Sequence, residues 1–284
     1  MIRIEAYAKV NYGLRVGPRR ADGFHPIHGR FQSVTVADEL TVGFGESDAI
    51  ISERGGPVPA GKGNLAWLAV DAVRQAARSH RPVVVTLDKK IPVAAGLGGG
   101  SADCAAALVA AQRLFGGSDE LVADLAADLG SDVPFCLTGG FAEVSGRGES
   151  VAPLPPSDGY ALALVVPPVE LSTSAVYHRW DEMGGPRGPG VDPQSVPTAL
   201  RGDDFRNDLV PPAFALQLAV AEWQAELRTR WGRDVLMSGS GPSLFAFALD
   251  VGEAEDMTGS VPVGARFAGV AEPVASGWLV LDEA

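Results

Sequence analysis

The sequence predicts an α+β protein, because strand-like and helix-like segments interleave in both halves of the chain without a strict βαβ order. Residues 1–50 alternate apolar and polar side chains in short segments, which is typical of antiparallel strands. A chain of 284 residues is long enough for two domains and a substantial core. A second half begins after "GRGES", so we expect domains at residues 1–152 and 153–284.

The first half is expected to combine those strands with helices. In the segment 65–78 the apolar side chains share one helical face, formed by Leu65, Leu68, Ala69, Ala72, Val73 and Ala76. Residues 82–91 are rich in β-branched side chains, which predicts a strand that leads into a cluster of glycines. A helix over 101–115 and another over 119–129, ended by Gly130, complete this half.

The second half repeats this mixture of elements. The expected elements, in chain order, are a strand over 160–168, a short helix over 173–180, a Gly/Pro-rich loop over 183–197, a long helix over 211–231, two strands flanking "SGSG", a helix near Glu253 and a last strand over 265–270. In the long helix, Leu216, Val220, Trp223 and Leu227 follow a helical period.

Charge and composition exclude several classes of function. The net charge of −12 argues against nucleic acid as a partner, because nucleic-acid binding depends on Lys and Arg neutralising phosphates. The sequence has no apolar N-terminal region and no run of about 18 apolar residues, so we expect a cytoplasmic protein without membrane contact. Cys104 and Cys136 lie in apolar stretches, which favours buried free thiols over a disulfide. The reactivity of Cys104 stays open, as does the choice between a monomer and a homodimer.

The glycine cluster "GLGGG" (96–100) lies between a predicted strand and a predicted helix. It is not a Walker A loop, because no Gly-Lys-[Ser/Thr] follows it, and it lacks the third glycine of a dinucleotide fingerprint, since position 101 is Ser. A helix N-terminus after a glycine loop presents free N–H groups to an anion such as phosphate. A tight packing turn is the alternative, and the pattern alone gives the two even weight.

Three segments in order along the chain resemble the motifs of the GHMP small-molecule kinases, namely "AYAKVNYGLRV", "PVAAGLGGGSADCAAAL" and "VLMSGSGPSLFAF". The segments "RADGFHPIHGRFQSV", "LGSDVPFCLTGG" and "FRNDL" are most similar to the members that act on a cytidine diphosphate-linked methylerythritol. The resemblance implies an N-terminal mixed α/β domain, a C-terminal ferredoxin-like domain and an active site in the cleft between them. It further implies ATP-dependent phosphorylation of the 2-hydroxyl group, in the methylerythritol phosphate route to isoprenoids.

The resemblance also assigns nucleotide-binding residues. ATP is expected to contact Asn64, Lys89, Pro92, Ala94, Ala95, Gly96, Leu97, Gly98, Gly99, Gly100, Ser101, Ala102, Ser238 and Gly239. Relatives often carry two adjacent serines where this chain has Gly100-Ser101-Ala102-Asp103, so Mg²⁺ ligation by Ser101 or Asp103 stays open. Taken alone, Asn64 fits a helix N-cap equally well, and Lys89 fits a surface lysine at the end of a strand.

Asp132 is the candidate base and Lys9 its electrostatic partner. Phosphoryl transfer needs positioning, charge stabilisation and a group that receives the proton of the alcohol. Taken alone, Asp132 fits an N-cap before Pro134, and Lys9 fits an edge lysine. The resemblance pairs the two residues. Asn11 lies two residues after Lys9 and therefore on the same face of the strand, where it is expected to donate to the diphosphate of the substrate or to Asp132.

The same resemblance predicts a base-binding end of the site. Phe24 and Tyr177 are expected to sandwich a cytosine, His25 to bind its edge, and Thr173 to lie on the phosphate side of the substrate. Asn207 in "FRNDL" matches a family motif without an assigned role. Three alternatives compete with this reading: a related kinase for mevalonate, homoserine or a sugar, a non-catalytic nucleotide sensor, and a dehydrogenase with a degenerate loop.

Overall fold

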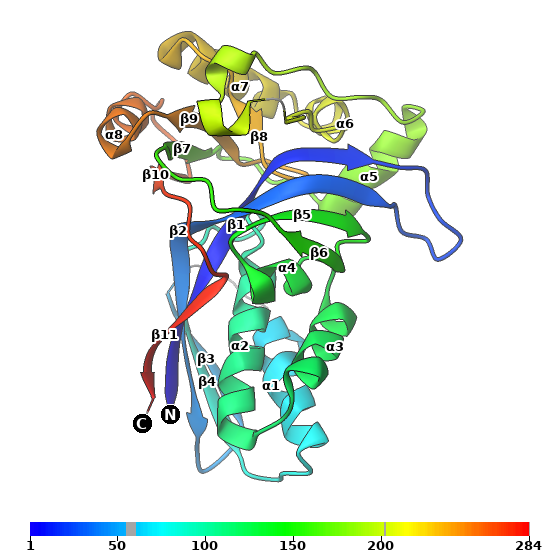
Figure 1. Ribbon diagram of the computed structural model, residues 1–284, viewed down its shortest axis with the longest axis vertical. Helices are drawn as coiled ribbons and strands as arrows, with labels where there is room; N and C mark the ends of the chain where they lie inside the picture. Colours follow the sequence, from blue (N-terminus) through cyan, green and yellow to red (C-terminus); the bar gives the residue numbers. More distant parts are fainter. Residues whose placement is uncertain (55–60, 202, 284) are drawn as a thin grey trace.

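Two long antiparallel strands, β1 and β2, form the spine of the molecule and run through most of its length (Figure 1). The computed structural model describes residues 1–54, 61–201 and 203–283. The first sheet has seven strands in the order β11-β1-β2-β4-β3, with β5 on β2 and β6 on β5. Its strands are β1 (Ile2–Val16), β2 (Ile27–Phe44), β3 (Ala49–Arg54), β4 (Val83–Asp88), β5 (Phe141–Gly146), β6 (Ser150–Pro153) and β11 (Trp278–Glu283).

Four helices form a layer beside this sheet (Figure 1). They are α1 (Leu65–Ala76), α2 (Gly99–Phe115), α3 (Asp119–Leu129) and α4 (Val133–Thr138), preceded by the 3₁₀ turn η1 (Gly61–Gly63). Of these, α2 and α4 contact the strands of the sheet, and α1 and α3 pack on α2. α2 contacts β1 and β2 directly, because its buried residues are mostly alanines that allow a close approach. The strand β4 and the helices α2 and α3 follow the expected pattern, but α2 begins at Gly99, two residues before the predicted start.

The buried face of α1 differs from the predicted one. Ala66, Trp67 and Val70 are buried, whereas Leu68 is exposed and Ala76 lies on the outer side. Ala69 and Val73 of the expected face are buried as predicted, but the face is turned toward Trp67 and Val70, which also repeat with helical spacing, because the core takes up the larger indole ring.

The second sheet has four antiparallel strands in the order β10-β7-β9-β8. Its strands are β7 (Ala161–Val166), β8 (Leu236–Met237), β9 (Leu244–Ala248) and β10 (Phe267–Ala271). The helices of this half are α5 (Thr173–Glu182), α6 (Val210–Leu216), α7 (Leu218–Trp231) and α8 (Val251–Gly259), with 3₁₀ turns η2 (Pro193–Ser195) and η3 (Thr198–Leu200).

Two predictions for this half were wrong. The helix over 211–231 is broken at Gln217, whose backbone is extended, and Leu216 is exposed rather than buried. The apolar period continues on both sides of the break, and no Gly or Pro marks it. β10 is also not the last strand, because β11 follows and pairs with β1 in the first sheet. The division at residue 152 stays a prediction, and the topology adds that the last strand returns to the first sheet.

Tyr12 joins the two sheets. Its side chain is 2% exposed, and its ring lies 5.9 Å from that of Phe141 in the first sheet and 5.1 Å from that of Phe247 in the second. Its hydroxyl shares a hydrogen bond of 2.9 Å with Tyr160. β1 therefore carries its polar residues to the junction of the two sheets. Among the described helices, none is long and apolar enough to cross a membrane.

Candidate active site

A cavity of about 960 Å³ lies at this junction. Residues from both halves of the chain line it, including the glycine cluster, the middle of β1 and the N-terminal part of α5. Every predicted site residue lines the cavity except Ala102 and Ser238, which are fully buried behind its wall. The residues predicted from separate motifs are thus brought together in one place.

The glycine cluster lies in the connection from β4 to α2 and adopts backbone conformations that favour glycine. Gly96 and Gly98 have φ of +79° and +72°, and Gly98 directly precedes the first turn of α2. That first turn leaves N–H groups without partners inside the helix, at the positive end of its dipole. A Cβ on Gly96 would lie 2.7 Å from the carbonyl oxygen of Ser238. The cluster is therefore a tight packing turn, and it lies at a helix N-terminus that faces the cavity, so its packing role does not exclude the expected anion site.

Lys9, Asn11 and Asp132 meet at the centre of the cavity. The Lys9 ammonium lies 3.2 Å from Oδ2 of Asp132 and donates a hydrogen bond of 2.7 Å to Oδ1 of Asn11. Lys9 is 5% exposed, so it is not an edge lysine. The side chain of Asp132 keeps 32% of its surface exposed toward the cavity. A buried cation thus faces a carboxylate that a bound molecule can reach.

The side chain of Asp132 does not act as an N-cap. Asp132 occupies the N-cap position of α4, but its carboxylate accepts no capping hydrogen bond. By contrast, the side chains of Ser118 and Asp250 do accept such bonds at α3 and α8. A carboxylate that is not used for capping is free to serve the cavity.

The position of Lys89 at the end of a strand suggested a surface lysine, but the side chain is buried. Its ammonium contacts the carboxylates of Asp38 and Asp103, the latter at 2.6 Å, and all three side chains are buried. Burial alone would lower the pKa of Lys89, but the two carboxylates outweigh it and raise that pKa. Burial raises the pKa of Asp103 to about 7, and the charge of Asp38 adds to this effect, because one ammonium faces two carboxylates.

At the other end of the cavity the rings of His25 and Tyr177 lie 5.3 Å apart at 30°. Nδ1 of His25 lies 3.0 Å from the carbonyl oxygen of Gly17, so this nitrogen carries a proton, and Nε2 lies 3.4 Å from Asp181. Phe24 is 47% exposed, with the Arg147 guanidinium 5.1 Å from its ring centre. The end of the cavity therefore offers aromatic faces and polar edges together.

The remaining predicted residues have defined surroundings. Oδ1 of Asn64 accepts the N–H of Ala66 at 2.9 Å, so the N-cap reading of Asn64 is confirmed. The hydroxyls of Thr173 and Ser240 lie 2.9 Å apart. Burial raises the pKa of the Cys104 thiol to about 12, so this cysteine is unreactive at neutral pH.

Sequence reasoning missed four charged residues of this region, Arg19, Asp38, Arg147 and Asp181. Arg19 and Arg147 lie in glycine-containing turns, where a charged side chain usually points into solvent. Asp38 reads as a polar residue of an alternating strand, and only the fold brings Lys89 to it. The one usable signal was Asp181, four residues after Tyr177 and therefore on the same face of α5.

Comparison with known proteins gives a consistent result. Residues 64–140 match the model of the GHMP kinases N-terminal domain. The chain is 39% identical over 266 residues to the 4-diphosphocytidyl-2-C-methyl-D-erythritol kinase of Moorella thermoacetica, covering 88% of this chain and 91% of that protein. A crystal structure of 4-(cytidine 5'-diphospho)-2C-methyl-D-erythritol kinase matches with a TM-score of 0.79 at 35% identity, over 96% of this chain and 100% of that one.

A homoserine kinase from Cytophaga hutchinsonii shares the fold, with a TM-score of 0.69 at 17% identity over 99% of this chain and 97% of that one. The predicted two-domain GHMP kinase fold is thereby confirmed, as is the resemblance on which it was based. With a bound alcohol and ATP, the Lys9–Asp132 pair beside a helix N-terminus is an arrangement suited to phosphoryl transfer. The chain belongs to the GHMP kinases, in the family of the 4-diphosphocytidyl-2-C-methyl-D-erythritol kinases.

Proposed function

We propose that this protein transfers the γ-phosphoryl group of ATP to the 2-hydroxyl group of 4-diphosphocytidyl-2-C-methyl-D-erythritol. The observation that carries the proposal is the ion pair of 3.2 Å between Lys9 and Asp132, open to the same cavity as the N-terminus of α2. An acceptor hydroxyl beside Asp132 and a phosphate at α2 then meet in one cavity.

The transfer is a direct in-line displacement. Asp132 takes the proton of the acceptor hydroxyl, and the oxygen of that hydroxyl bonds to the γ-phosphorus of ATP. The bond between this phosphorus and the bridging oxygen of ADP breaks at the same time. Lys9 pairs with the Asp132 carboxylate at 3.2 Å and stabilises the charge that develops on the transferred group. Asn11 fixes the Lys9 ammonium through their hydrogen bond of 2.7 Å. No covalent phosphoenzyme forms.

The backbone around α2 holds the phosphates of ATP. The protein as a whole carries a net charge of −12, and Lys89 is already neutralised by Asp38 and Asp103. Free N–H groups in the first turn of α2, with the hydroxyl of Ser101, therefore supply most of the attraction for these anions. The other predicted contacts, from Pro92 to Leu97 and at Gly239, form the adjoining wall of the cavity.

Mg²⁺ is the cofactor proposed to accompany ATP. Protein sites for Mg²⁺ commonly supply only one or two ligands, while substrate phosphates and water provide the rest. Oδ1 of Asp103 is buried without a hydrogen-bond partner, and Asp103 and Ser101 both line the cavity, so these residues fit such a partial site. The ion would neutralise charge on the phosphates when bound. Among the described residues no cluster of three or more metal-ligating side chains occurs.

The aromatic end of the cavity selects the nucleobase. Phe24 and Tyr177 supply faces on which a cytosine stacks, and Nε2 of His25 supplies a hydrogen-bonding group for the edge of the base. Thr173 lines the same cavity, with its hydroxyl 2.9 Å from that of Ser240, and is proposed to contact the phosphate side of the substrate. Mevalonate and homoserine carry no base, so this end of the cavity argues against them as acceptors.

The test is a coupled assay of ADP release with MgATP and three acceptors: 4-diphosphocytidyl-2-C-methyl-D-erythritol, mevalonate and homoserine. We expect turnover with the cytidine acceptor alone, and a new phosphate monoester signal in the phosphorus NMR spectrum of the product. Turnover with mevalonate or homoserine alone would contradict the proposed acceptor. ATP binding without turnover on any acceptor would favour the nucleotide sensor.

A further inference from the structure

The buried side chain of Asn207 has every polar atom engaged. Asn207 is 5% exposed and lies in the segment 205–209, "FRNDL". Its amide nitrogen donates to the carbonyl oxygens of Met237 at 2.8 Å and Gly239 at 2.7 Å. Its Oδ1 accepts the N–H of Leu209 at 2.9 Å. One side chain thus fixes two carbonyl groups on either side of Ser238.

Those carbonyls belong to the turn 238–241, which connects β8 to β9. The turn is closed by a hydrogen bond of 2.9 Å from the N–H of Gly241 to the carbonyl of Ser238. A Cβ on Gly239 would lie 3.1 Å from Oδ1 of Asn11 and 3.6 Å from Nζ of Lys9. The turn is therefore packed closely against Lys9 and Asn11, the two β1 residues that line the cavity.

The same turn presents unused donors. Gly239 and Ser240 line the cavity, and their N–H groups have no acceptor within the part of the chain that the structure describes. An unpaired N–H beside an anion-binding cavity is a donor for a phosphate oxygen. Where these donors lie depends on how the turn is held.

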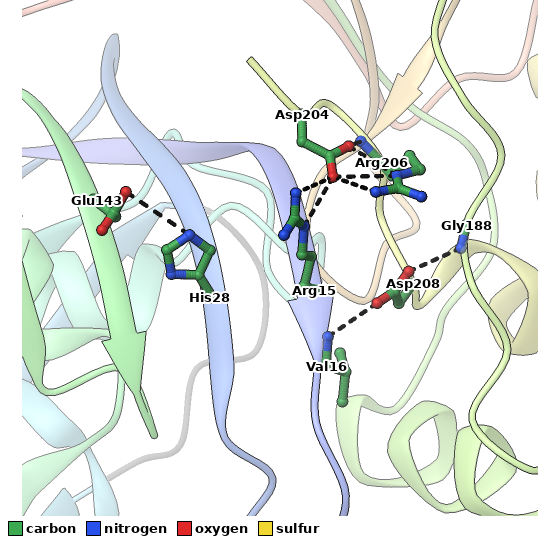
Figure 2. Close-up of polar contacts among 8 residues, drawn as sticks. All are labelled: Arg15, Val16, His28, Glu143, Gly188, Asp204, Arg206 and Asp208. Carbon is green, nitrogen blue, oxygen red and sulfur yellow. Dashed lines mark hydrogen bonds and ion pairs between the residues drawn. The ribbon is translucent and has the colours of Figure 1, made fainter. Parts of the chain in front are cut away.

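The segment 205–209 is itself fixed to β1. The N–H of Leu14 donates to the carbonyl of Arg206 at 2.8 Å, and the N–H of Asp208 donates to the carbonyl of Leu14 at 2.9 Å. Figure 2 shows that the Asp208 carboxylate bridges the N–H groups of Val16 and Gly188, at 3.1 and 2.9 Å.

Charge pairing adds to this attachment. Figure 2 also shows Asp204 between the guanidinium groups of Arg15 and Arg206. The hydrogen bonds from Arg206, followed by those from Arg15, lower the pKa of Asp204, so the pairing persists at neutral pH. The backbone around Asn207 is thus attached to β1, the strand that carries Lys9 and Asn11, while the side chain of Asn207 is hydrogen-bonded to the turn.

We infer that Asn207 is a positioning residue for phosphoryl transfer: it holds the turn 238–241 in register with Lys9 and Asn11. The inference rests on the proposed roles of Lys9 and Asp132. It adds a residue that acts through the turn and is not expected to contact the γ-phosphoryl group of ATP or the acceptor hydroxyl. Displacement of a positioning element by about 1 Å can cost a factor of about 10² in rate. The role of the segment "FRNDL" is then to hold the turn between β8 and β9 of the second sheet in a fixed position relative to β1.

The test replaces Asn207 by Asp, which keeps the shape but removes both donors and sets a negative charge against two carbonyl oxygens. We expect kcat to fall roughly 10- to 100-fold. The dissociation constant of cytidine 5'-diphosphate, measured by calorimetry, should stay within about threefold, because the base-binding end lies elsewhere in the cavity. Asn207→Ser is the second variant: it keeps an acceptor for Leu209 but is too short to reach both carbonyls, and it serves if Asn207→Asp does not fold.

Gln224→Glu is the matched control. Gln224 donates from its side-chain amide to the carbonyl of Val235 at 2.8 Å, just before β8, and it does not line the cavity. Both substitutions remove support of the same kind, so both should lower the melting temperature, but only the Asn207 variants should lower kcat. A folded Asn207 variant that keeps kcat within about threefold, or an equal loss of kcat in Gln224→Glu, overturns the inference. Absence of turnover in the unmodified chain would instead overturn the proposed function.

Discussion

Lys9 and Lys89 are two buried lysines whose aspartate partners differ in their exposure to solvent. They are 5% and 6% exposed, and each forms ion pairs with aspartates. Lys9 faces Asp132, whose side chain is 32% exposed. Lys89 faces Asp38 and Asp103, whose side chains are 0% and 6% exposed. The carboxylate that faces Lys9 is accessible to solvent, whereas Lys89, Asp38 and Asp103 form a closed cluster of nearly buried side chains, of which Lys89 and Asp103 lie in the cavity wall.

The difference lies in the fold around each pair. The partner of Lys9 stands at the start of a short helix that opens on the cavity, so its carboxylate can exchange a proton with a bound alcohol. The partners of Lys89 come from β2 and α2, and they tie the end of β4 to both elements. The closed cluster thereby fixes the strand and helix between which the glycine cluster runs. The two pairs are alike in residue type and differ in the accessibility of their carboxylates, and the proposed catalytic role of Asp132 rests on this difference.

The largest expected effect is the loss of the buried cation of the closed cluster. Lys89→Met leaves two carboxylates in the interior without a counter-ion, so the free energy of unfolding should fall by about 3–5 kcal/mol. Lys9→Met should cost less, because Asp132 can be hydrated from the cavity. Urea denaturation of both variants measures the difference. Equal losses, or a loss under about 1 kcal/mol for Lys89→Met, would contradict the contrast between the two lysines.

A pH dependence of stability follows from Asp103. Its pKa is raised from 3.8 to about 7, so the folded protein binds more protons than the unfolded chain in that range. The contribution of Asp103 to stability therefore falls as the pH rises from about 4 to about 7, and is constant above that range. Asp103→Asn removes this titration. The difference in unfolding free energy between wild type and Asp103→Asn should decline over that window; a rise, or no change, would show that the second carboxylate is not strained.

A smaller effect is expected at the entrance to α2. Gly98→Ala forces a Cβ onto a residue with φ of +72° and places it 2.9 Å from Cγ of Lys9. Backbone strain should lower stability by about 1–2 kcal/mol, and the displaced Lys9 should lower kcat/KM by a factor of about 10.

Gly232→Ala is the control for Gly98→Ala. Gly232 has a φ of +62° at the end of α7, with nothing within 4 Å of an added Cβ. It should show the stability loss without the kinetic loss. If both variants lose kcat/KM equally, contact with Lys9 is not the cause.

The sequence was sufficient for elements whose ends are marked locally. Ser118 and Gly130 bound α3, and the strand over 83–88 has a β-branched pattern that no helix shares. The break at Gln217 carries no such mark, and β11 is separated from its partner β1 by nearly the whole chain. What could not be read locally depends on tertiary pairing.

The same limit applies to the site. The resemblance of the motifs to the GHMP kinases was what named Lys9, Asp132 and the glycine cluster, because the local pattern left a structural alternative open for each of them. The partners of Lys89 were not predictable, because Asp38 and Asp103 lie 51 and 14 residues away in the chain. Asn207 had a motif but no role until the fold set its amide against the turn 238–241.

The most direct test of the central claim is the rate of ADP formation at saturating MgATP and 4-diphosphocytidyl-2-C-methyl-D-erythritol, in wild type and Asp132→Asn. Asp132 makes no capping hydrogen bond, so α4 should still form in the variant, and the loss of the ion pair with the buried Lys9 should lower the melting temperature without unfolding the protein at about 25 °C. Its rate should be lower by a factor of about 10² or more, the range for a lost general base. A variant that keeps the wild-type rate would contradict the assignment of Asp132 as the group that takes the proton.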